Sequence, residues 1–398
     1  MTCPRRFALA LAWAVVTLLA ATSTQAAAPP LWKDGLVDGD RVVFLGNTFI
    51  EREQHEGYLE TALTAQYHDR NITFRNLGWS GDDVFGRSRA RFGNAEEGWN
   101  HLNNSLDLVK PTAAIVCYGS NAAFEGEAGL QKFREGYTRL LAAVERHTKK
   151  IMLISPPPIE DLGSPLPNPQ AHNAMLAKYR DVIQEIAYEH QYQIVDLTDQ
   201  LGKKFTPHIH GKATLTSNGV HLTEYGYWEA AQAVAAALGE STPVVVMEKL
   251  ELTTSVPLTT SAPLPKSSVS YQGEVLDIAH DMIVRSETER NGKFGVAADG
   301  ENLGMVTGQQ LQTGIGANVP KLAAAAEKLR QTIVAKNELF FHRYRPQNET
   351  YLFLFRKHEQ GNNAVEIPQF DPLIEAKERE IAQLRQPVSL DIRLTPQK

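Results

Sequence analysis

Cysteine is nearly absent from this chain of 398 residues, which has only Cys3 and Cys117. Cys3 lies in an N-terminal segment that we expect to be removed, so the mature chain would keep a single thiol. One thiol cannot form an internal disulfide. Cys117 lies within the apolar run AAIVCYG, and this position favours a buried structural thiol over a reactive one. The fold must therefore be stabilised by its hydrophobic core.

A surplus of basic residues is also absent, because 40 Lys and Arg stand against 46 Asp and Glu, a formal net charge of −6. Binding to nucleic acid requires Lys and Arg concentrated against phosphates, so the composition excludes a general nucleic-acid partner. The chain has no glycine-rich phosphate loop and no cysteine cluster for a metal. His208 and His210 are close together, but no third ligand accompanies them. We therefore predict no metal and no cofactor.

Long apolar runs are missing except for one, FALALAWAVVTLLAA, which follows Arg5 and Arg6 and precedes the small residues TSTQAAA. This order of basic, apolar and small residues is typical of a secretory signal peptide. A membrane anchor is the alternative, but the run is shorter than the roughly 20 apolar residues that a span needs. We expect residues 1–26 to be a signal peptide, and the mature protein to be exported to the periplasm or outside the cell without a membrane span.

Short apolar runs alternate with longer amphipathic stretches between residues 41 and 238. The apolar runs predict strands at 41–46, 72–78, 113–119, 150–156 and 192–197, and the stretches predict helices at 57–67, 97–108, 130–147, 171–190 and about 223–238. Strands that are apolar along their whole length indicate a parallel sheet covered on both faces. Repeated strand–helix units then predict the α/β class, as a three-layer α/β/α sandwich with a mostly parallel five-stranded sheet.

This alternation ends after Gly239. Residues 241–270 are rich in Ser, Thr, Pro and Val, which predicts an extended strand or a linker. A hairpin follows around Asp299-Gly300, and helices are predicted over 321–336 and 372–384. We therefore divide the mature chain into a main domain, residues 32–240, and a smaller C-terminal α+β extension, residues 241–398.

An aromatic and basic segment lies within the extension, between Asn337 and Phe370. Three alternating aromatic residues and three arginines mark it: Tyr351, Phe353, Phe355, Arg343, Arg345 and Arg356. In a strand, alternate side chains share one face. One interpretation is an aromatic strand that packs on the main domain with a charged rim. The other is a surface near the catalytic residues that binds sugar rings or carboxylates.

Polar and glycine-containing segments follow three predicted strands, and a fourth precedes the last helix of the main domain. They are Gly46-Asn47-Thr48, Gly78-Trp79-Ser80-Gly81-Asp82, Gly119-Ser120-Asn121 and Ser217-Asn218-Gly219-Val220-His221. In an open parallel sheet the ligand site lies at the carboxyl ends of the strands, so these segments are expected to converge. A hydroxyl, backbone donors, an amide and a histidine are the parts of an acyl-transfer centre.

In their order and spacing these segments resemble the four blocks of the SGNH (GDSL) hydrolase family. The resemblance covers about residues 38–240 and implies the flavodoxin-like SGNH fold and hydrolysis of ester-linked acyl groups. It implies that Thr48 takes the place of the nucleophile, that His221 is the base, and that Asn218 takes the place of the group that orients it. Gly81 and Asn121, with the backbone N–H of Thr48, would form the oxyanion hole.

Two residues depart from the family pattern, because the nucleophile is usually Ser and the orienting residue usually Asp. The extra methyl group of Thr48 crowds the approach to an acyl carbon and restricts χ1. Asn218 cannot stabilise an imidazolium and can select the wrong tautomer of His221. In the serine-protease triad that change lowers kcat by about 10⁴.

Two functions therefore remain open. One is an ester hydrolase acting on acylated carbohydrate or other small esters. The other is a catalytically impaired binding protein for carbohydrate or small acyl ligands. A third interpretation is a module of a larger surface assembly.

Four of the site residues also have a structural interpretation. Thr48 could cap the following helix, Gly81 could serve a tight turn, Asn121 could be a turn residue, and His221 could merely begin a helix. Asp82 and Asp83 could orient His221 in place of Asn218, or could cap turns at the surface.

Overall fold

The computed structural model describes residues 30–205, 214–239, 242–258, 281–287, 290–359 and 361–397. The expected signal peptide, His208 and His210 lie outside these ranges.

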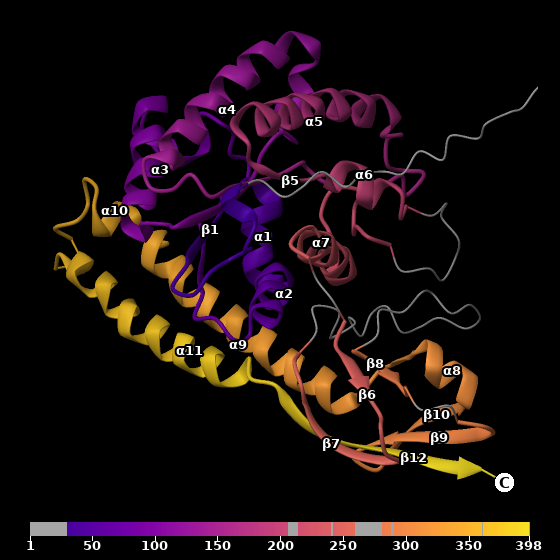
Figure 1. Cartoon of the computed structure of the whole chain (residues 1–398). Coiled ribbons are helices and arrows are strands. Elements are labelled where there is room, and N and C mark those ends of the chain that lie inside the picture. Colours follow the sequence, from indigo (N-terminus) through magenta and orange to yellow (C-terminus); the bar gives the residue numbers. More distant parts are fainter. Residues whose placement is uncertain are drawn as a thin grey trace, which may run out of the picture.

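A parallel sheet forms the centre of the main domain (Figure 1). Its strands are β1 (Arg41–Gly46), β2 (Thr73–Asn76), β3 (Ala113–Cys117), β4 (Ile151–Ile154) and β5 (Gln193–Val195). Their order is β2-β1-β3-β4-β5, and every neighbouring pair is parallel. Each strand lies within a segment predicted from its apolar run. The prediction of a mostly parallel five-stranded sheet is therefore confirmed.

Helices cover both faces of this sheet, as a sheet that is apolar on both sides requires. The core on one face includes residues of α1 (Thr48–Glu56), α2 (Tyr58–Gln66), α6 (Leu197–Gly202) and α7 (Glu224–Ala237). The core on the other face includes residues of α3 (Ala95–Val109), α4 (Leu130–Glu145) and α5 (Gln170–His190). Cys117 is buried in the first core, as expected for a structural thiol.

Helix α1 was not predicted, because its sequence, TFIEREQHE, is mostly polar. It forms nevertheless, since Phe49 and Ile50 turn into the core and Gly57 ends the helix in the left-handed conformation (φ 70°). A glycine is favoured at such a position because it lacks a Cβ. This helix matters for function because Thr48 is its first residue.

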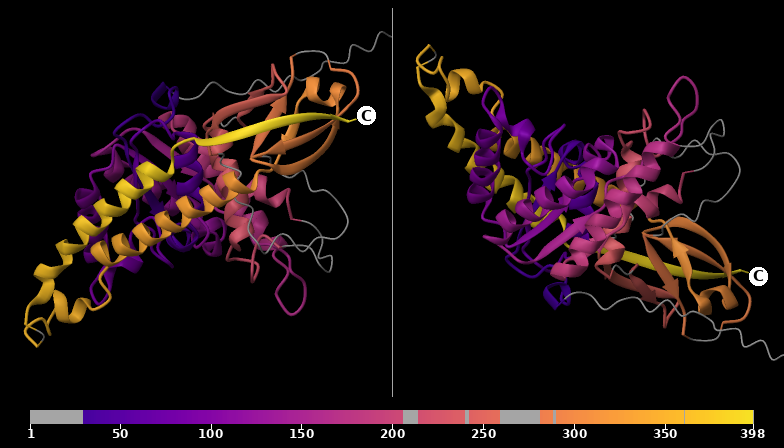
Figure 2. Two further views of the ribbon diagram at one scale, coloured as in Figure 1. Left: turned by 90° about the horizontal axis from the view of Figure 1, so that it is seen from below. Right: turned by 90° about the horizontal axis from the view of Figure 1, so that it is seen from above.

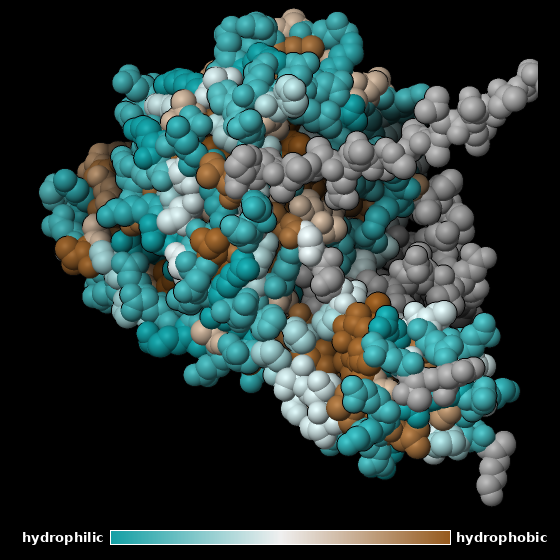
Figure 3. All heavy atoms as spheres, in the orientation of Figure 1, coloured by the Kyte–Doolittle hydropathy of each residue, from teal (hydrophilic) through white to brown (hydrophobic). Residues whose placement is uncertain are grey.

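The extension begins with two small sheets that share a third core. One contains β6 (Val244–Val246), β8 (Met282–Arg285) and β11 (Ile315–Ala317), in the order β11-β8-β6. The other contains β7 (Glu251–Val256), β9 (Lys293–Ala298), β10 (Glu301–Thr307) and β12 (Val388–Gln397), in the order β10-β9-β12-β7. Helix α8 (Gly308–Thr313) follows β10. The predicted hairpin at Asp299-Gly300 joins β9 to β10, whereas β12 was not predicted. Apolar residues gather on the surface near β6 and β8 (Figure 3).

Two long helices run from these sheets back along the main domain (Figures 1 and 2). Helix α9 (Pro320–Tyr344) leads away from the sheets and α11 (Phe370–Leu384) returns. The segment between them contains α10 (Glu349–Leu352) and a 3₁₀ helix, Asn363–Gln369. The proposed aromatic strand is therefore wrong. Tyr351 lies in α10, and Phe355 lies in a turn with 80% of its surface exposed. The backbone here makes local helical and turn hydrogen bonds, such as that from the N–H of Phe353 to the carbonyl of Glu349 at 2.9 Å, instead of pairing as a strand.

Helix α9 shares a core with the main domain. Lys336 has no exposed surface, and its ammonium group donates hydrogen bonds to Glu60 of α2 and, at 3.1 Å, to the carbonyl of Phe74. Phe340 and Tyr344 belong to the same apolar cluster as Trp79 of the main domain. The extension is therefore anchored by both apolar packing and a buried ion pair. No helix within the described ranges is long and apolar enough to cross a membrane.

Candidate active site

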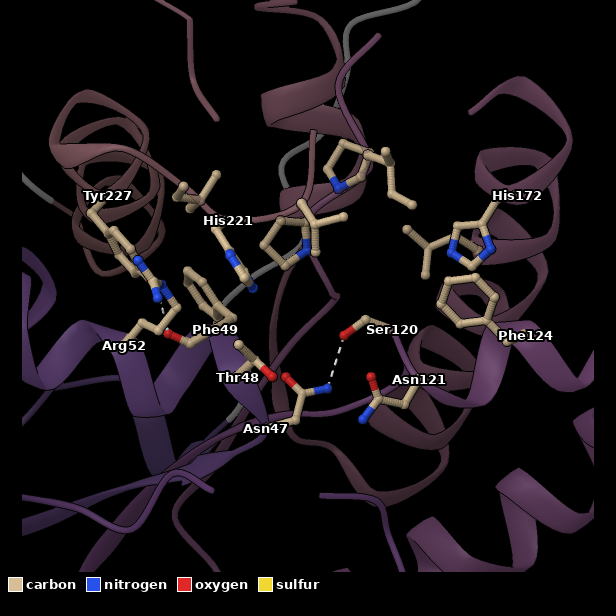
Figure 4. Close-up of a pocket in the computed structure, with 16 residues that line it drawn as sticks. Asn47, Thr48, Phe49, Arg52, Ser120, Asn121, Phe124, His172, His221 and Tyr227 are labelled. Atoms are coloured by element: carbon tan, nitrogen blue, oxygen red, sulfur yellow. Dashed lines mark hydrogen bonds between the residues drawn. The ribbon is translucent and has the colours of Figure 1, made fainter. Parts of the chain in front are cut away.

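The segments that follow β1 and β3, and the segment before α7, meet at one pocket beyond the carboxyl ends of the strands (Figure 4). The pocket has a volume of about 100 Å³. Its lining consists of Asn47, Thr48, Phe49, Arg52, Ser120, Asn121, Phe124, Pro157, Pro158, Ile159, His172, Leu176, Val220, His221, Leu222 and Tyr227. Of the five site residues that the sequence suggested, Thr48, Asn121 and His221 line the pocket directly. Gly81 and Asn218 reach it through hydrogen bonds.

Thr48 lies at the first position of α1, directly after β1. The residue before it, Asn47, occupies the N-cap position, so the interpretation of Thr48 as the helix cap is wrong. The Oγ1 atom of Thr48 accepts a hydrogen bond from the backbone N–H of Gly81, at 3.3 Å. The hydroxyl therefore lies beside a backbone donor, as a nucleophile lies beside an oxyanion hole.

Gly81 has a left-handed backbone conformation (φ 74°), which a residue with a Cβ adopts only with strain. This conformation accompanies the N–H hydrogen bond to Thr48. Gly78, in the same loop, approaches α1 so closely that an added Cβ would lie 2.3 Å from the backbone nitrogen of Glu51. The tight-turn and oxyanion-hole interpretations of Gly81 are therefore compatible, because the turn that the two glycines permit is what places the Gly81 N–H beside Thr48.

Asn121 ends the Gly119-Ser120-Asn121 segment after β3, and its side-chain amide donates to the carbonyl of Asp82 at 3.1 Å. This bond joins the loop after β3 to the loop that carries Gly81. Among the described residues, the second N–H of the amide has no acceptor, so it remains available to a ligand oxygen. Next to it, Asn47 donates to the hydroxyl of Ser120 at 2.8 Å.

The side chain of Asn218 faces the ring of His221. Its Oδ1 atom accepts hydrogen bonds from the backbone N–H groups of Val220, at 3.1 Å, and His221, at 2.9 Å. These two donors fix the orientation of the amide, so its nitrogen faces Nδ1 of His221 at 3.3 Å. Nδ1 must then accept, and the proton of the neutral ring lies on Nε2. A general base of the triad type needs the free lone pair on Nε2, so Asn218 favours the unproductive tautomer.

Burial, and to a lesser degree the positive charge of Arg52, lower the pKa of His221 below the usual 6.5. The imidazole is therefore neutral at pH 7. A neutral ring is suited to take a proton, provided that the correct nitrogen is free.

Asp82 and Asp83 do not orient His221. Asp82 is fully buried and accepts hydrogen bonds from Arg89, at 2.6 Å, and from the hydroxyl of Tyr118, at 3.1 Å. Surface capping is therefore also wrong for Asp82, whose ion pair with Arg89 secures the loop from inside. Asp83 does accept backbone N–H groups, from Phe85 at 3.0 Å and from Arg87 at 3.3 Å.

The end of α9 supports the loop that carries Gly81. The hydroxyl of Tyr344 donates to the carbonyl of Gly78 at 2.8 Å. Arg345 donates to one carboxylate oxygen of Glu51 at 2.7 Å, and the other oxygen accepts the N–H of Ser80 at 2.5 Å. No local signal in the sequence could reveal this support, because the contacting residues are distant in the chain.

The other two arginines of the aromatic segment are engaged elsewhere. Arg343 pairs with Asp371 at 2.8 Å, and Arg356 pairs with Glu359. In the described part of the chain, no residue after 240 lines the pocket. The extension thus contacts the site through Tyr344 and Arg345 and does not form its wall.

The walls of the pocket contain residues that the sequence did not single out. Figure 4 shows Arg52, His221 and Tyr227 on one side and Phe124 and His172 on the other, above Asn47, Thr48, Ser120 and Asn121. The ring centroids of Phe124 and His172 are 4.1 Å apart, and Phe124 is 74% exposed. Arg52 comes one helical turn after Thr48, a spacing that would have indicated a shared face had α1 been predicted.

The parallel five-stranded sheet with helices on both faces is the α/β/α arrangement of the SGNH hydrolase fold. Residues 45–229 match the model of the GDSL-like Lipase/Acylhydrolase family. Among solved structures, the chain is similar to a gut microbial diltiazem-metabolizing enzyme, with a TM-score of 0.61 and 14% sequence identity. That likeness covers 91% of this chain and 98% of the other. It therefore extends the shared fold into the C-terminal extension.

Two weaker likenesses cover less of the chain. An acetylxylan esterase from Geobacillus stearothermophilus is 18% identical, with a TM-score of 0.40 over 52% of this chain and 96% of the esterase. The (E,E)-geranyllinalool synthase of Arabidopsis thaliana is 34% identical over 104 residues. That stretch spans 26% of this chain and only 12% of the plant protein.

Proposed function

We propose that this protein binds small acyl esters in the Thr48 pocket and hydrolyses them. The observation that carries this proposal is the juxtaposition of three groups. The Thr48 hydroxyl lies 3.3 Å from the Gly81 N–H, and Asn121 and His221 line the same pocket. Nucleophile, oxyanion donors and base are the minimum that acyl transfer requires.

In this mechanism, Thr48 Oγ1 attacks the acyl carbon while its proton passes to Nε2 of His221. The N–H groups of Gly81 and Asn121 stabilise the negative charge on the former carbonyl oxygen. The ester bond then breaks, and the leaving alcohol takes the proton from His221. Water, deprotonated by His221, next attacks the acyl-threonine, releasing the acid and restoring Thr48. Each turnover needs the Nδ1–H tautomer of His221, which Asn218 disfavours, so hydrolysis is expected to be slow.

The dimensions of the pocket favour a small acyl group. Pockets for drug-sized ligands usually have volumes of about 300–1,000 Å³, whereas this one has about 100 Å³, enough for an acetyl group. Phe124, largely exposed beside His172, offers an aromatic face against which a sugar ring can stack. We therefore propose O-acetylated carbohydrate as the substrate class.

A second function is supported by the orientation of Asn218. If its amide holds His221 in the unproductive tautomer at all times, the pocket still keeps its donors and becomes a binding site for acylated carbohydrate. The hydrolase and the binding protein would therefore bind the same ligands, and only the hydrolase would turn them over.

Assays with a panel of acyl esters distinguish the hydrolase from the binding protein. Purified protein is assayed for hydrolysis and, by calorimetry, for binding of O-acetylated sugars. Hydrolysis that is lost in Thr48→Ala and in His221→Ala supports the enzyme. Thr253→Ala and His190→Ala are matched controls, because both residues lie outside the pocket. Binding without turnover supports the binding protein, and turnover that survives Thr48→Ala removes Thr48 from the mechanism.

We also propose that the protein is exported. The basic pair Arg5-Arg6 and the apolar run behind it support this. Mass spectrometry of the exported protein should show an N-terminus near Ala27, whereas an intact Met1 would contradict cleavage.

A further inference from the structure

Arg52 places a positive charge at the pocket, one helical turn from the candidate nucleophile. It follows Thr48 by four residues on α1, so the two residues share a face and are separated by about 6 Å along the helix axis. Both side chains line the pocket. In Figure 4 the guanidinium lies on the same side as His221 and Tyr227.

The guanidinium of Arg52 has no partner among the residues that the structure describes. Within the described ranges it makes no hydrogen bond and no ion pair, and its Nε atom is buried without an acceptor. A buried donor that lacks a partner is costly, and more so when it is charged. The arginines around it are satisfied, for example Arg330 by Glu327 and Arg345 by Glu51.

Within the described part of the chain, no acidic residue forms an ion pair with Arg52. Burial raises the pKa of Glu53 well above its usual value and so favours the uncharged form of this carboxyl. Burial also raises the pKa of Glu56, with Glu224 of α7 adding to the effect, while Arg330 of α9 and Arg52 itself oppose it. None of the sixteen described lining residues is Asp or Glu. In a chain of net charge −6, the fixed charge at this pocket is thus positive.

We propose that Arg52 is an anion-binding subsite, and that the ligand of this pocket carries a carboxylate close to its ester group. The planar guanidinium can bind both oxygens of a carboxylate at once. With the ester at Thr48 and the carboxylate at Arg52, both groups belong to one small molecule, as in an O-acetylated uronic acid. This inference rests on the proposed function, because it assigns the substrate class of the same pocket.

Binding is measured in a Thr48→Ala background, where the proposed mechanism leaves no nucleophile. The probes are O-acetylated glucuronic acid, its neutral counterpart O-acetylated glucose, and inorganic phosphate. Arg52→Gln removes the charge, Arg52→Lys keeps it without the planar fork, and Arg393→Gln is a control at an exposed arginine of β12. Thermal unfolding checks the fold. Because Arg52 bonds to no described residue, Arg52→Gln should leave Tm unchanged, whereas a structural role would lower it.

The acidic sugar should bind at least tenfold more tightly than the neutral one, about 1.4 kcal/mol. Arg52→Gln should abolish that preference, Arg52→Lys should keep part of it, and Arg393→Gln should keep all of it. Equal affinities in the Arg52 protein, a preference that survives Arg52→Gln, or no binding of the acidic sugar at millimolar concentration would each overturn the inference. Binding of phosphate without binding of the acidic sugar would show that the carboxylate assignment is wrong.

Hydrolysis by the protein with Thr48 intact separates this inference from the proposed function. Arg52-dependent binding of the acidic sugar without turnover would retain the subsite and reject the hydrolase. Hydrolysis of both sugars at equal kcat/KM would support the hydrolase and reject the anion-binding subsite.

Discussion

The guanidinium of Arg345 lies over the indole ring of Trp79, 3.6 Å from its centroid. Trp79 belongs to the loop that carries Gly81, and Arg345 directly follows α9. Arg345 also bonds to Glu51, 294 positions earlier in the chain, and the same carboxylate accepts the N–H of Ser80. The loop that presents the oxyanion donor is therefore supported by a residue of the C-terminal extension.

Replacing Arg345 by Ala should destabilise the protein by about 1–2 kcal/mol, because a cation–π contact and a partly buried ion pair are lost together. It should also lower the kcat of ester hydrolysis more than it raises KM, since the Gly81 N–H acts in the transition state. Urea unfolding and steady-state kinetics measure the two effects. Arg343→Ala is the control, because its partner Asp371 is half exposed. Equal effects of Arg345→Ala and Arg343→Ala would argue against a role of Arg345 in supporting the Gly81 loop.

The double variant Thr48→Ser/Asn218→Asp should hydrolyse esters faster than the wild type, by about 10²–10⁴ if the tautomer is the main limitation. Ser lacks the crowding methyl group, and an Asp carboxylate accepts the Nδ1–H of His221 and so frees Nε2. The gain should exceed the product of the single gains, because the members of a triad act as a unit. Initial rates on acetyl esters measure it. No gain in a folded double variant would show that the pocket is unsuited to ester chemistry.

Replacing Asn218 by Asp should shift the acidic limb of the pH profile of kcat/KM. In the wild type the pKa of His221 is lowered, so the neutral base persists below pH 6.5. A carboxylate at position 218 favours the imidazolium and raises that pKa. The acidic limb of Asn218→Asp should therefore lie at higher pH than that of the wild type. A limb that shifts to lower pH, or stays in place, would contradict the assignment of His221 as base.

His101, whose ring contacts Trp79 edge-on, should make the protein less stable in acid. Burial, together with Arg91, Arg89 and Arg345, lowers its pKa from 6.5 to about 3. The unfolded chain takes up a proton below pH 6.5 while the folded chain does not. The stability due to the neutral ring is thus complete above pH 6.5 and is lost as the pH falls toward 3, by about 1.4 kcal/mol per pH unit.

The substitution His101→Gln should remove this part of the acid sensitivity. Free energies of unfolding at pH 7 and pH 5 measure it, with the exposed His55→Gln as control. If the free energy of unfolding of His101→Gln depended on pH as that of the wild type does, His101 would not be a source of the acid sensitivity.

The amino-acid sequence by itself determined the central sheet and the edge at which the site lies. Apolar runs such as RVVFLG and AAIVCYG specify buried parallel strands through local composition alone. The direction of parallel strands then requires that Thr48 and Asn121 lie at the same edge. Glycine at position 81 likewise permits the positive φ that the turn adopts.

Only the tertiary structure decided what surrounds these residues. Helix α1 is too polar to be recognised from its pattern, yet it brings Arg52 to the pocket. Lys336 is buried because Glu60 and the carbonyl of Phe74 meet it there, and Arg345 reaches Trp79 because α9 packs along the main domain. The orientation of Asn218 depends on which backbone N–H groups its oxygen meets. Such contacts form between segments far apart in the chain, or depend on the exact path of a turn, so they follow from packing and not from local sequence.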